Sequence, residues 1–255
     1  MDGVSLMLID SHAHLDEIDD IEDAISEARL MRVEAIVGVG MTIDSNRLIL
    51  SLADRYRGYI YAAIGYHPWE IKPENVDETL AFIKQNLSMC VALGEVGLDY
   101  KARVKKAYQR EVLSRLLEIA HDHRKPAILH CRFSHDRTLE LVQEGRLKEG
   151  VFHWYTGSIG TLRNILNHGY SISASPALAY SPPHQEAIRY APLERILIET
   201  DSPVAYGGKA SRPVDVRRTA ELVAEIKGEP FQEVADRTAE NARKLFGIQR
   251  SDNST

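Results

Sequence analysis

Short apolar runs recur eight times along this chain of 255 residues, and stretches with helical spacing separate them. Each run has the length and the Val, Ile and Leu content of a strand that is buried on both faces. The runs lie at residues 6–9, 35–39, 59–64, 91–93, 127–129, 150–152, 170–173 and 196–198. This alternation predicts an α/β fold built around a parallel sheet.

The stretches between the runs carry apolar residues at helical intervals. One face of a single helix would hold five of them, at positions 104, 108, 112, 116 and 120, because they recur every four residues. Residues 21–31 and 214–226 show the same kind of spacing. Eight strand–helix units are the number that closes a (β/α)8 barrel of the TIM type, and the chain length fits one such barrel.

An open, doubly wound sheet is the alternative architecture. Its nucleotide-binding forms have a glycine-rich turn after the first strand, whereas this chain continues from its first apolar run into DSHAH at residues 10–14. The barrel is therefore favoured. We expect one TIM-barrel hydrolase domain over residues 1–248 and a flexible C-terminal tail over residues 249–255.

Composition narrows the class of protein further. Hydrophobic residues make up 44% of the chain and charged residues 27%, which is enough to bury a large core and excludes disorder as the main state. The net charge of −6 argues against a surface that is a nucleic-acid groove throughout, although a local basic lip is compatible with it.

Two distant cysteines, Cys90 and Cys131, build no disulfide framework, and no apolar run approaches the roughly 18 residues of a membrane span. We expect a soluble, cytoplasmic protein without membrane contact.

The stretch after the first apolar run carries the first candidate ligands. Alternate side chains of a strand share a face, so Asp10, His12 and His14 would point the same way. A lone histidine is more often a packed or exposed side chain than a ligand. Two imidazoles on one rigid strand, however, supply two ligands for zinc or another divalent ion at little entropic cost.

More ligand-type residues follow the later apolar runs. In a closed barrel the carboxyl ends of all strands converge on one face, where the active sites of this fold lie. Together with the histidine pair, these residues could hold two divalent ions with a carboxylate between them, and the donor types leave zinc, manganese and magnesium open. They are Glu95 after the fourth run, His130 after the fifth, His153 after the sixth and Asp201 after the eighth.

A series of motifs in this order resembles the signatures of TatD-type metal-dependent deoxyribonucleases, which belong to the amidohydrolase-like barrels. The motifs span most of the chain: DSHAHLD at 10–16, GYHP at 65–68, GEVGLDY at 94–100, LHCR at 129–132, HWYTG at 153–157 and ETDSP at 199–203. The resemblance implies that His12, His14, Glu95 and Asp201 hold one ion and that Glu95, His130 and His153 hold the other, with Glu95 as the bridge. Residues 154–156 and 204–208 depart from the family pattern without touching a ligand, so they alter the pocket rim.

Three residues near these motifs are candidates for substrate contact. Arg132 leaves the fifth strand beside His130, and its guanidinium can bind phosphate oxygens through two hydrogen bonds. His67 could contact a substrate phosphate or make a structural hydrogen bond in its X-Pro turn. Trp69 could stack on a base at the rim or simply pack.

Other polar residues receive supporting interpretations. Glu199 shares strand parity with Asp201 and would lie one layer deeper, where it would support the ligands. Four basic residues, at positions 101, 103, 105 and 106, could steer a phosphate backbone, although a solvated first helical turn explains them slightly better. We expect solvated or capping roles for His121, His123, His168 and His184.

These inferences combine into a mechanism. Two divalent ions would polarise a scissile phosphate and activate water, and Asp201 would accept the proton while Glu95 bridges the ions. Single-stranded DNA or frayed 3′ ends fit a barrel mouth best, and the family resemblance implies a 3′–5′ exonuclease. The main alternative keeps the barrel and its metals but hydrolyses small esters, lactones, amides or phosphotriesters. A non-catalytic scaffold with structural ions is the remaining alternative.

Overall fold

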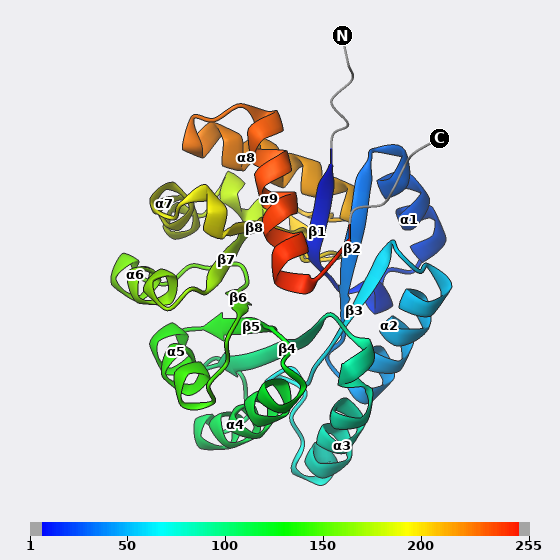
Figure 1. Ribbon diagram of the computed structural model, residues 1–255, viewed down its shortest axis with the longest axis vertical. Coiled ribbons are helices and arrows are strands. Elements are labelled where there is room, and N and C mark those ends of the chain that lie inside the picture. Colours follow the sequence, from blue (N-terminus) through cyan, green and yellow to red (C-terminus); the bar gives the residue numbers. More distant parts are fainter. Residues whose placement is uncertain (1–6, 250–255) are drawn as a thin grey trace.

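The computed structural model describes residues 7–249, and its main sheet contains eight parallel strands in sequential order (Figure 1). Each strand pairs with the one that precedes it in the chain, as the apolar runs predict. The strands are β1 (Leu8–Ala13), β2 (Val33–Val39), β3 (Ile60–Ile64), β4 (Ala92–Asp99), β5 (Ala127–Arg132), β6 (Gly150–Phe152), β7 (Ser171–Ala174) and β8 (Ile196–Ile198).

The first and last strands meet and close the sheet into a barrel. The backbone N–H of Asp201 donates to the carbonyl of His12 at 2.9 Å, and that of His14 donates to the carbonyl of Ser202 at 2.8 Å. The Asp10 carboxylate adds a link, because it accepts hydrogen bonds from the backbone N–H and the hydroxyl of Thr200. Closure confirms the (β/α)8 barrel and excludes the open sheet.

Helices form a ring around the strands (Figure 1). The helices expected at 21–31, around 104–120 and at 214–226 are confirmed as α1, α4 and α8, with ends that differ by a few residues. The helices are α1 (Ile21–Leu30), α2 (Ile43–Arg55), α3 (Val76–Asn86), α4 (Lys106–His123), α5 (His135–Glu144), α6 (Ile159–Asn167), α7 (Pro182–Tyr190), α8 (Val216–Lys227) and α9 (Phe231–Phe246). A short hairpin, β9 (Ala205–Tyr206) with β10 (Lys209–Ala210), follows β8.

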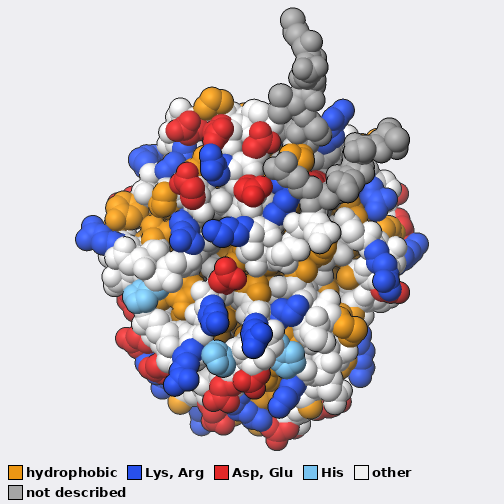
Figure 2. Space-filling model, in the orientation of Figure 1, with side chains coloured by type: hydrophobic (Ala, Val, Ile, Leu, Met, Phe, Trp, Pro, Cys, Tyr) orange, Lys and Arg blue, Asp and Glu red, His pale blue; other side chains and the backbone are white. Residues whose placement is uncertain are grey.

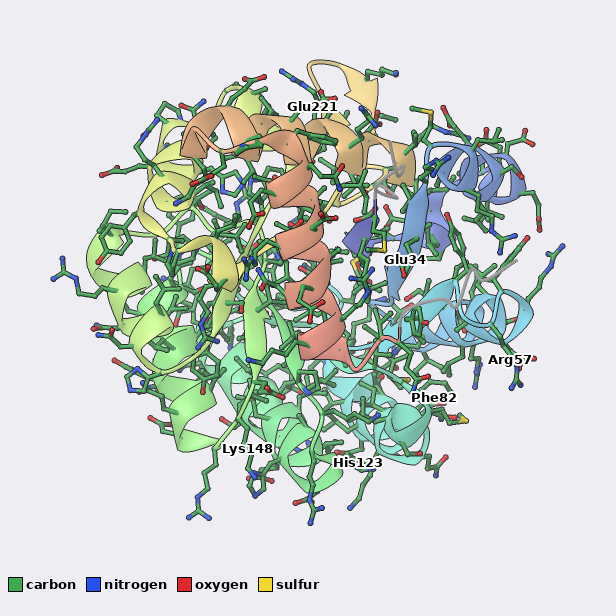
Figure 3. The ribbon with its side chains drawn as sticks, turned by 45° about the horizontal axis from the view of Figure 1, so that its top comes forward. Glu34, Arg57, Phe82, His123, Lys148 and Glu221 are labelled. Atoms are coloured by element: carbon green, nitrogen blue, oxygen red, sulfur yellow. The ribbon has the colours of Figure 1, made fainter. Side chains whose placement is uncertain are left out.

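The last helix, α9, covers the amino-terminal end of the barrel, which faces the viewer in Figure 1. Its Ala239, Ala242 and Phe246 pack with side chains of the barrel interior in one apolar cluster. Arg243 of the same helix pairs with Glu34 at the start of β2, which Figure 3 labels beside α9. Acidic and basic side chains are interspersed on this face (Figure 2).

Three strands continue at least three residues past the carboxyl ends of their apolar runs. The first strand begins at Leu8 and continues through Ala13, the fourth continues to Asp99, and the fifth continues to Arg132. These extensions contain polar residues that have hydrogen-bonding partners inside the barrel. Each of the three strands can therefore continue beyond its apolar part. Residues 1–6, which include the predicted start of the first strand, lie outside the described part, as do residues 250–255 of the predicted tail. Gln249 is exposed.

One histidine contradicts its expected role. His184 in α7 is fully buried instead of solvated, and its Nε2 accepts a hydrogen bond from the backbone N–H of Ser175 at 3.1 Å. Its Nδ1 lies 2.7 Å from the carbonyl oxygen of Tyr155, to which it donates. Periodicity did not reveal this role, because the partners lie in two loops outside the helix, 9 and 29 residues before His184 in the chain. Within residues 7–249, no helix has both the length and the apolar character needed to cross a membrane.

Candidate metal centre

The six predicted metal ligands meet at the carboxyl-terminal end of the barrel. His12, Glu95 and His130 lie within β1, β4 and β5. His14 directly follows β1, His153 directly follows β6, and Asp201 lies three residues after β8. Five of the six are at most 6% exposed, and His130 is partly buried. The predicted convergence of these residues on one face therefore agrees with the structure.

Glycines allow the strands to approach closely at this point. A Cβ atom at Gly97 would lie 2.0 Å from the carbonyl oxygen of His130, and one at Gly65 would lie 2.4 Å from the carbonyl oxygen of Glu95. Any larger residue would push β4 away from β3 or β5. The two glycines thus keep the Glu95 backbone close to its neighbours.

Four donor atoms form a compact first group: His12 Nε2, His14 Nε2, Glu95 Oε2 and Asp201 Oδ1. The two nitrogens are 3.2 Å apart, and each lies 3.4 Å from both oxygens. Zinc ligands at about 2.0–2.1 Å from a tetrahedral ion are separated by roughly 3.3–3.4 Å. This spacing fits a divalent cation, and a cation would also relieve the repulsion between nitrogen lone pairs that face each other.

The other oxygen of Glu95 faces a second group of donors. Its Oε1 lies 2.8 Å from His130 Nδ1 and 2.7 Å from His153 Nε2. The two histidine nitrogens are 3.4 Å apart. One carboxylate therefore presents one oxygen to each group, which is the arrangement that a bridging ligand needs.

The charges at the centre agree with a cation site. Burial alone would lower the pKa of His14 and of His153, but the neighbouring carboxylates outweigh burial and raise the pKa of both imidazoles well above its usual value. Burial would likewise raise the pKa of Glu95, yet the surrounding histidines hold that pKa well below its usual value. The carboxylates are thus ionised and attract positive charge, which divalent ions can supply in place of protons.

Three further carboxylates hold the candidate ligands in place. Glu199 accepts from the backbone N–H of Trp154 at 3.1 Å and lies 3.3 Å from His153 Nδ1, so it occupies the supporting position expected for it. Asp99 lies 3.4 Å from His130 Nε2. Asp10 fixes β1 against the segment after β8. Carboxylates that bind the outer nitrogen of a ligating histidine orient its ring and strengthen its basicity.

Asp99 is a residue that the sequence reasoning missed as part of the site. It accepts hydrogen bonds from the indole N–H of Trp69 at 2.6 Å and from the backbone N–H of Lys101 at 2.7 Å. Burial would raise its pKa, but the hydrogen bonds from His130 and Trp69 outweigh this and lower the pKa below its usual range. Strand parity with Glu95 was the available signal, because residues 95, 97 and 99 share one face of β4.

His67 lies deeper than a residue of the pocket rim. It is 2% exposed, its Nε2 lies 3.6 Å from Glu95 Oε1, and its Nδ1 accepts from the backbone N–H of Trp69 at 3.2 Å. Burial lowers its pKa to about 3, so the imidazole stays neutral. With Glu95 and His130 it forms a third possible ligand group, beside those expected from the sequence.

A cavity of about 520 Å³ opens onto the centre. This volume lies within the usual range of small-molecule sites. Trp69 and Arg132 line the cavity, and the side chains of both are about half exposed, at 53% and 54%. Both predicted rim residues therefore lie where a substrate could reach them.

Comparisons with known proteins agree with this geometry. The family model for TatD related DNases matches residues 9–247. Human deoxyribonuclease TATDN3 is 31% identical, over 96% of this chain and 97% of its own length. The metal-dependent hydrolase YabD of Bacillus subtilis is 33% identical, over 95% of this chain and 100% of its own length.

A solved structure shows the same fold. The crystal structure of YjjV, a TatD homologue from Escherichia coli, matches with a TM-score of 0.88 at 28% identity, covering 95% of this chain and 98% of its own. The family-model match at residues 9–247 covers the barrel and includes all six candidate ligands. This chain therefore belongs to the family of TatD-related deoxyribonucleases and is a metal-dependent hydrolase.

Proposed function

We propose that residues 1–248 form one hydrolase domain that cleaves phosphodiester bonds in DNA with two divalent ions. The observation that carries the proposal is the orientation of Glu95, whose two oxygens face two separate groups of donors. One ion would be held by His12, His14, Glu95 and Asp201, and the other by Glu95, His130 and His153. The abundance of imidazole favours zinc or manganese over magnesium alone.

Divalent ions bound there would polarise a phosphate oxygen and lower the pKa of a coordinated water. The chain supplies the base. Burial would raise the pKa of Asp201, but the hydrogen bond with His14 and the nearby histidines outweigh burial and lower this pKa to about 2. The carboxylate is therefore ionised at neutral pH and can accept the proton that the attacking water loses.

Rim residues of the cavity would hold the rest of the substrate. Arg132 would bind a phosphate, because it lines the cavity with a half-exposed side chain and its guanidinium lies 4.0 Å from Asp99 Oδ2, too far for a hydrogen bond that would occupy it. Trp69 would stack on a base, with its ring orientation fixed by the hydrogen bond to Asp99. His67 lies deeper than the rim, where it would hold the backbone N–H of Trp69 in place and contact the same phosphate from below.

The proposed substrate is single-stranded DNA or a frayed 3′ end. A site at the bottom of a barrel mouth admits a strand terminus more easily than the middle of a duplex. Cleavage from the 3′ end is the direction that family membership favours. DNA is also the substrate class named for the human relative.

A cytoplasmic location is a further part of the proposal. Cys90 and Cys131 are both buried free thiols, which a reducing compartment preserves. Cell fractionation tests this point directly.

The deciding experiment compares substrates on protein reconstituted with zinc or manganese. Single-stranded and duplex DNA, labelled at either end, are incubated beside a panel of neutral lactones and esters. Arg132→Ala is measured with wild type, and Arg57→Ala serves as the control, because Arg57 is an exposed arginine that pairs with Asp54 at the edge of the molecule (Figure 3).

The outcomes separate the candidate functions. We expect hydrolysis of single-stranded DNA that shortens the strand from its 3′ end, and we expect Arg132→Ala to weaken this hydrolysis more than that of any neutral ester. Hydrolysis of esters or lactones without DNA cleavage would replace the proposal with a small-molecule hydrolase. Tight metal binding without turnover on any substrate would indicate a scaffold.

A further inference from the structure

A phenylalanine next to the cavity-lining residue Arg132 belongs to neither apolar core cluster of the described residues. Phe133 follows Arg132, the last residue of β5, and its side chain is 68% exposed. Its φ is 56°, in the left-handed region that bulky residues rarely adopt. The chain thus carries an unfavourable backbone conformation and an exposed aromatic ring at the same position.

The turn between β5 and α5 explains the positive φ of Phe133 but not the presence of a bulky, exposed side chain at this position. Ser134, the next residue, is buried, and its hydroxyl donates to the carbonyl oxygen of Leu98 at 2.6 Å. The chain must therefore turn sharply between β5 and α5. Glycine or asparagine would adopt the left-handed conformation with less strain. Strained residues of this kind gather at functional sites.

A neighbouring lysine connects the ring to a residue beside the metal centre. Lys101 Nζ lies 5.0 Å from the centroid of the Phe133 ring. The backbone of Lys101 is bound to Asp99, which also binds the Trp69 indole and lies beside His130. The buried Asp99 carboxylate thus contacts Trp69, Lys101 and Arg132, and Phe133 lies beside Lys101 and follows Arg132 in the chain. These two aromatic and two basic residues form one patch. We call this patch the β4–β5 rim, and its members are Trp69, Lys101, Arg132 and Phe133.

We propose that Phe133 is a stacking site for a nucleobase of the single-stranded substrate, further from the metal centre than Trp69. The inference rests on the proposed function and names how the strand leaves the cavity. Aromatic rings stack on bases, and basic side chains attract the phosphates between them. A duplex keeps its bases paired inside and cannot use such a ring. The β4–β5 rim therefore selects single strands.

The test removes the ring and relieves the backbone in one change. Phe133→Gly is compared with wild type and with Phe133→Tyr, which keeps a ring. Arg32→Gly is the matched control, because Arg32 is exposed, has a φ of 60° and directly precedes β2 at the other end of the barrel. KM and kcat are measured on a single-stranded oligonucleotide and on methyl p-nitrophenyl phosphate, a phosphodiester without nucleobases. Tm and metal content are measured on each protein.

We expect Phe133→Gly to raise Tm or leave it unchanged while KM for the oligonucleotide rises at least about fivefold relative to KM for the small phosphodiester. A fivefold change corresponds to about 1 kcal/mol, the lower end of the value for stacking one base on an aromatic ring. Phe133→Tyr should retain the wild-type KM. Arg32→Gly should leave both values of KM unchanged.

Several results would overturn the inference. If wild type cleaves the oligonucleotide and Phe133→Gly keeps KM within twofold, the ring holds no base. If Phe133→Gly instead leaves KM unchanged but changes the oligomeric state of the protein in solution, the ring forms a contact between copies of the chain. If wild type cleaves no DNA, the proposed function fails first. Binding of a fluorescent oligonucleotide then decides about Phe133, and an equal Kd for wild type and Phe133→Gly rejects it.

Discussion

Glu95 is the residue on which the arrangement of the site depends. Its Oε2 faces His12 and His14 at 3.4 Å, and its Oε1 faces His130 and His153 at under 3 Å. An ordinary carboxylate thus lies between the two groups of donors, and we propose it as the bridge between two ions.

We expect Glu95→Gln to lose metal and nearly all activity. An amide offers one neutral oxygen to one group of donors and turns an NH2 group toward the other, so at least one ion loses its shared ligand. Metal per chain is measured by elemental analysis after dialysis, with the exposed Glu118→Gln in α4 as the control. Two ions retained in Glu95→Gln would show that Glu95 is not the bridge.

Asp201 should matter for turnover more than for substrate affinity. Replacing it by Asn keeps an oxygen near His12 and His14 but removes the group that accepts the proton. We expect Asp201→Asn to lower kcat by about 10²- to 10⁴-fold at saturating metal, with a much smaller change in KM. Steady-state kinetics with metal content checked tests this. A kcat within a few fold of wild type, with both ions bound, would assign the proton to another base.

At the scale of elements, the neutral imidazole of His184 holds α7 against the loops that follow β6 and β7. His184 accepts from the Ser175 amide after β7 and donates to the Tyr155 carbonyl after β6, so it ties the helix to two loops. Burial lowers the pKa of His184 to about 4, from an ordinary value of about 6.5 in the unfolded chain. A protonated ring could no longer accept from Ser175.

This pKa difference predicts a loss of stability in acid. Because the pKa of His184 is lower in the folded protein than in the unfolded chain, its contribution to the free energy of unfolding is complete above about pH 6.5. It falls as the pH drops toward 4, by about 3 kcal/mol in total. We therefore expect the difference in free energy of unfolding between wild type and His184→Gln to shrink from pH 8 to pH 4. Denaturant unfolding at several pH values measures it.

A matched histidine provides the control for this prediction. His168, at the end of α6, is exposed, and His168→Gln is measured over the same pH range as the control. A difference for His184→Gln that varies with pH no more than the difference for His168→Gln would mean that His184 is not held neutral by the fold.

At the scale of the whole molecule, the barrel has a closed end and an open end. The helix α9 packs Ala239, Ala242 and Phe246 against the barrel interior at the amino-terminal end, while the cavity opens at the other end. Stability and chemistry are thus separated along the barrel axis, as in other enzymes of this fold.

We expect Phe246→Ala to destabilise the protein without changing its chemistry. Phe246 is 4% exposed, and removing a buried ring costs about 3–5 kcal/mol, which in a domain of this size lowers Tm by about 6 °C or more. Metal content and kcat at 25 °C should stay at wild-type values. Calorimetry and kinetics decide, with Leu30→Ala as the control, because Leu30 is 82% exposed. A loss of metal together with stability would show that the two ends of the barrel are coupled.

The sequence by itself determined the fold class and the convergence of the candidate ligands on one face of the barrel. Periodicity reports which residues are apolar and which face of an element they occupy, so eight runs with helical stretches between them led to the barrel. Parallel strands that close into a barrel must end on one face, so His12, His14, Glu95, His130, His153 and Asp201 could be brought together before any distance was known.

Only the tertiary structure decided how these groups are arranged. Which oxygen of Glu95 faces which histidines, why Asp99 holds Trp69 and His130, and why His184 is buried all depend on contacts between segments from different strands. Such contacts follow from the stagger and closure of the barrel and from the paths of its loops. A local sequence pattern contains neither the closure of the barrel nor the paths of its loops. It shows which way a side chain points from its own strand, but not how far that side chain lies from the side chains of other strands.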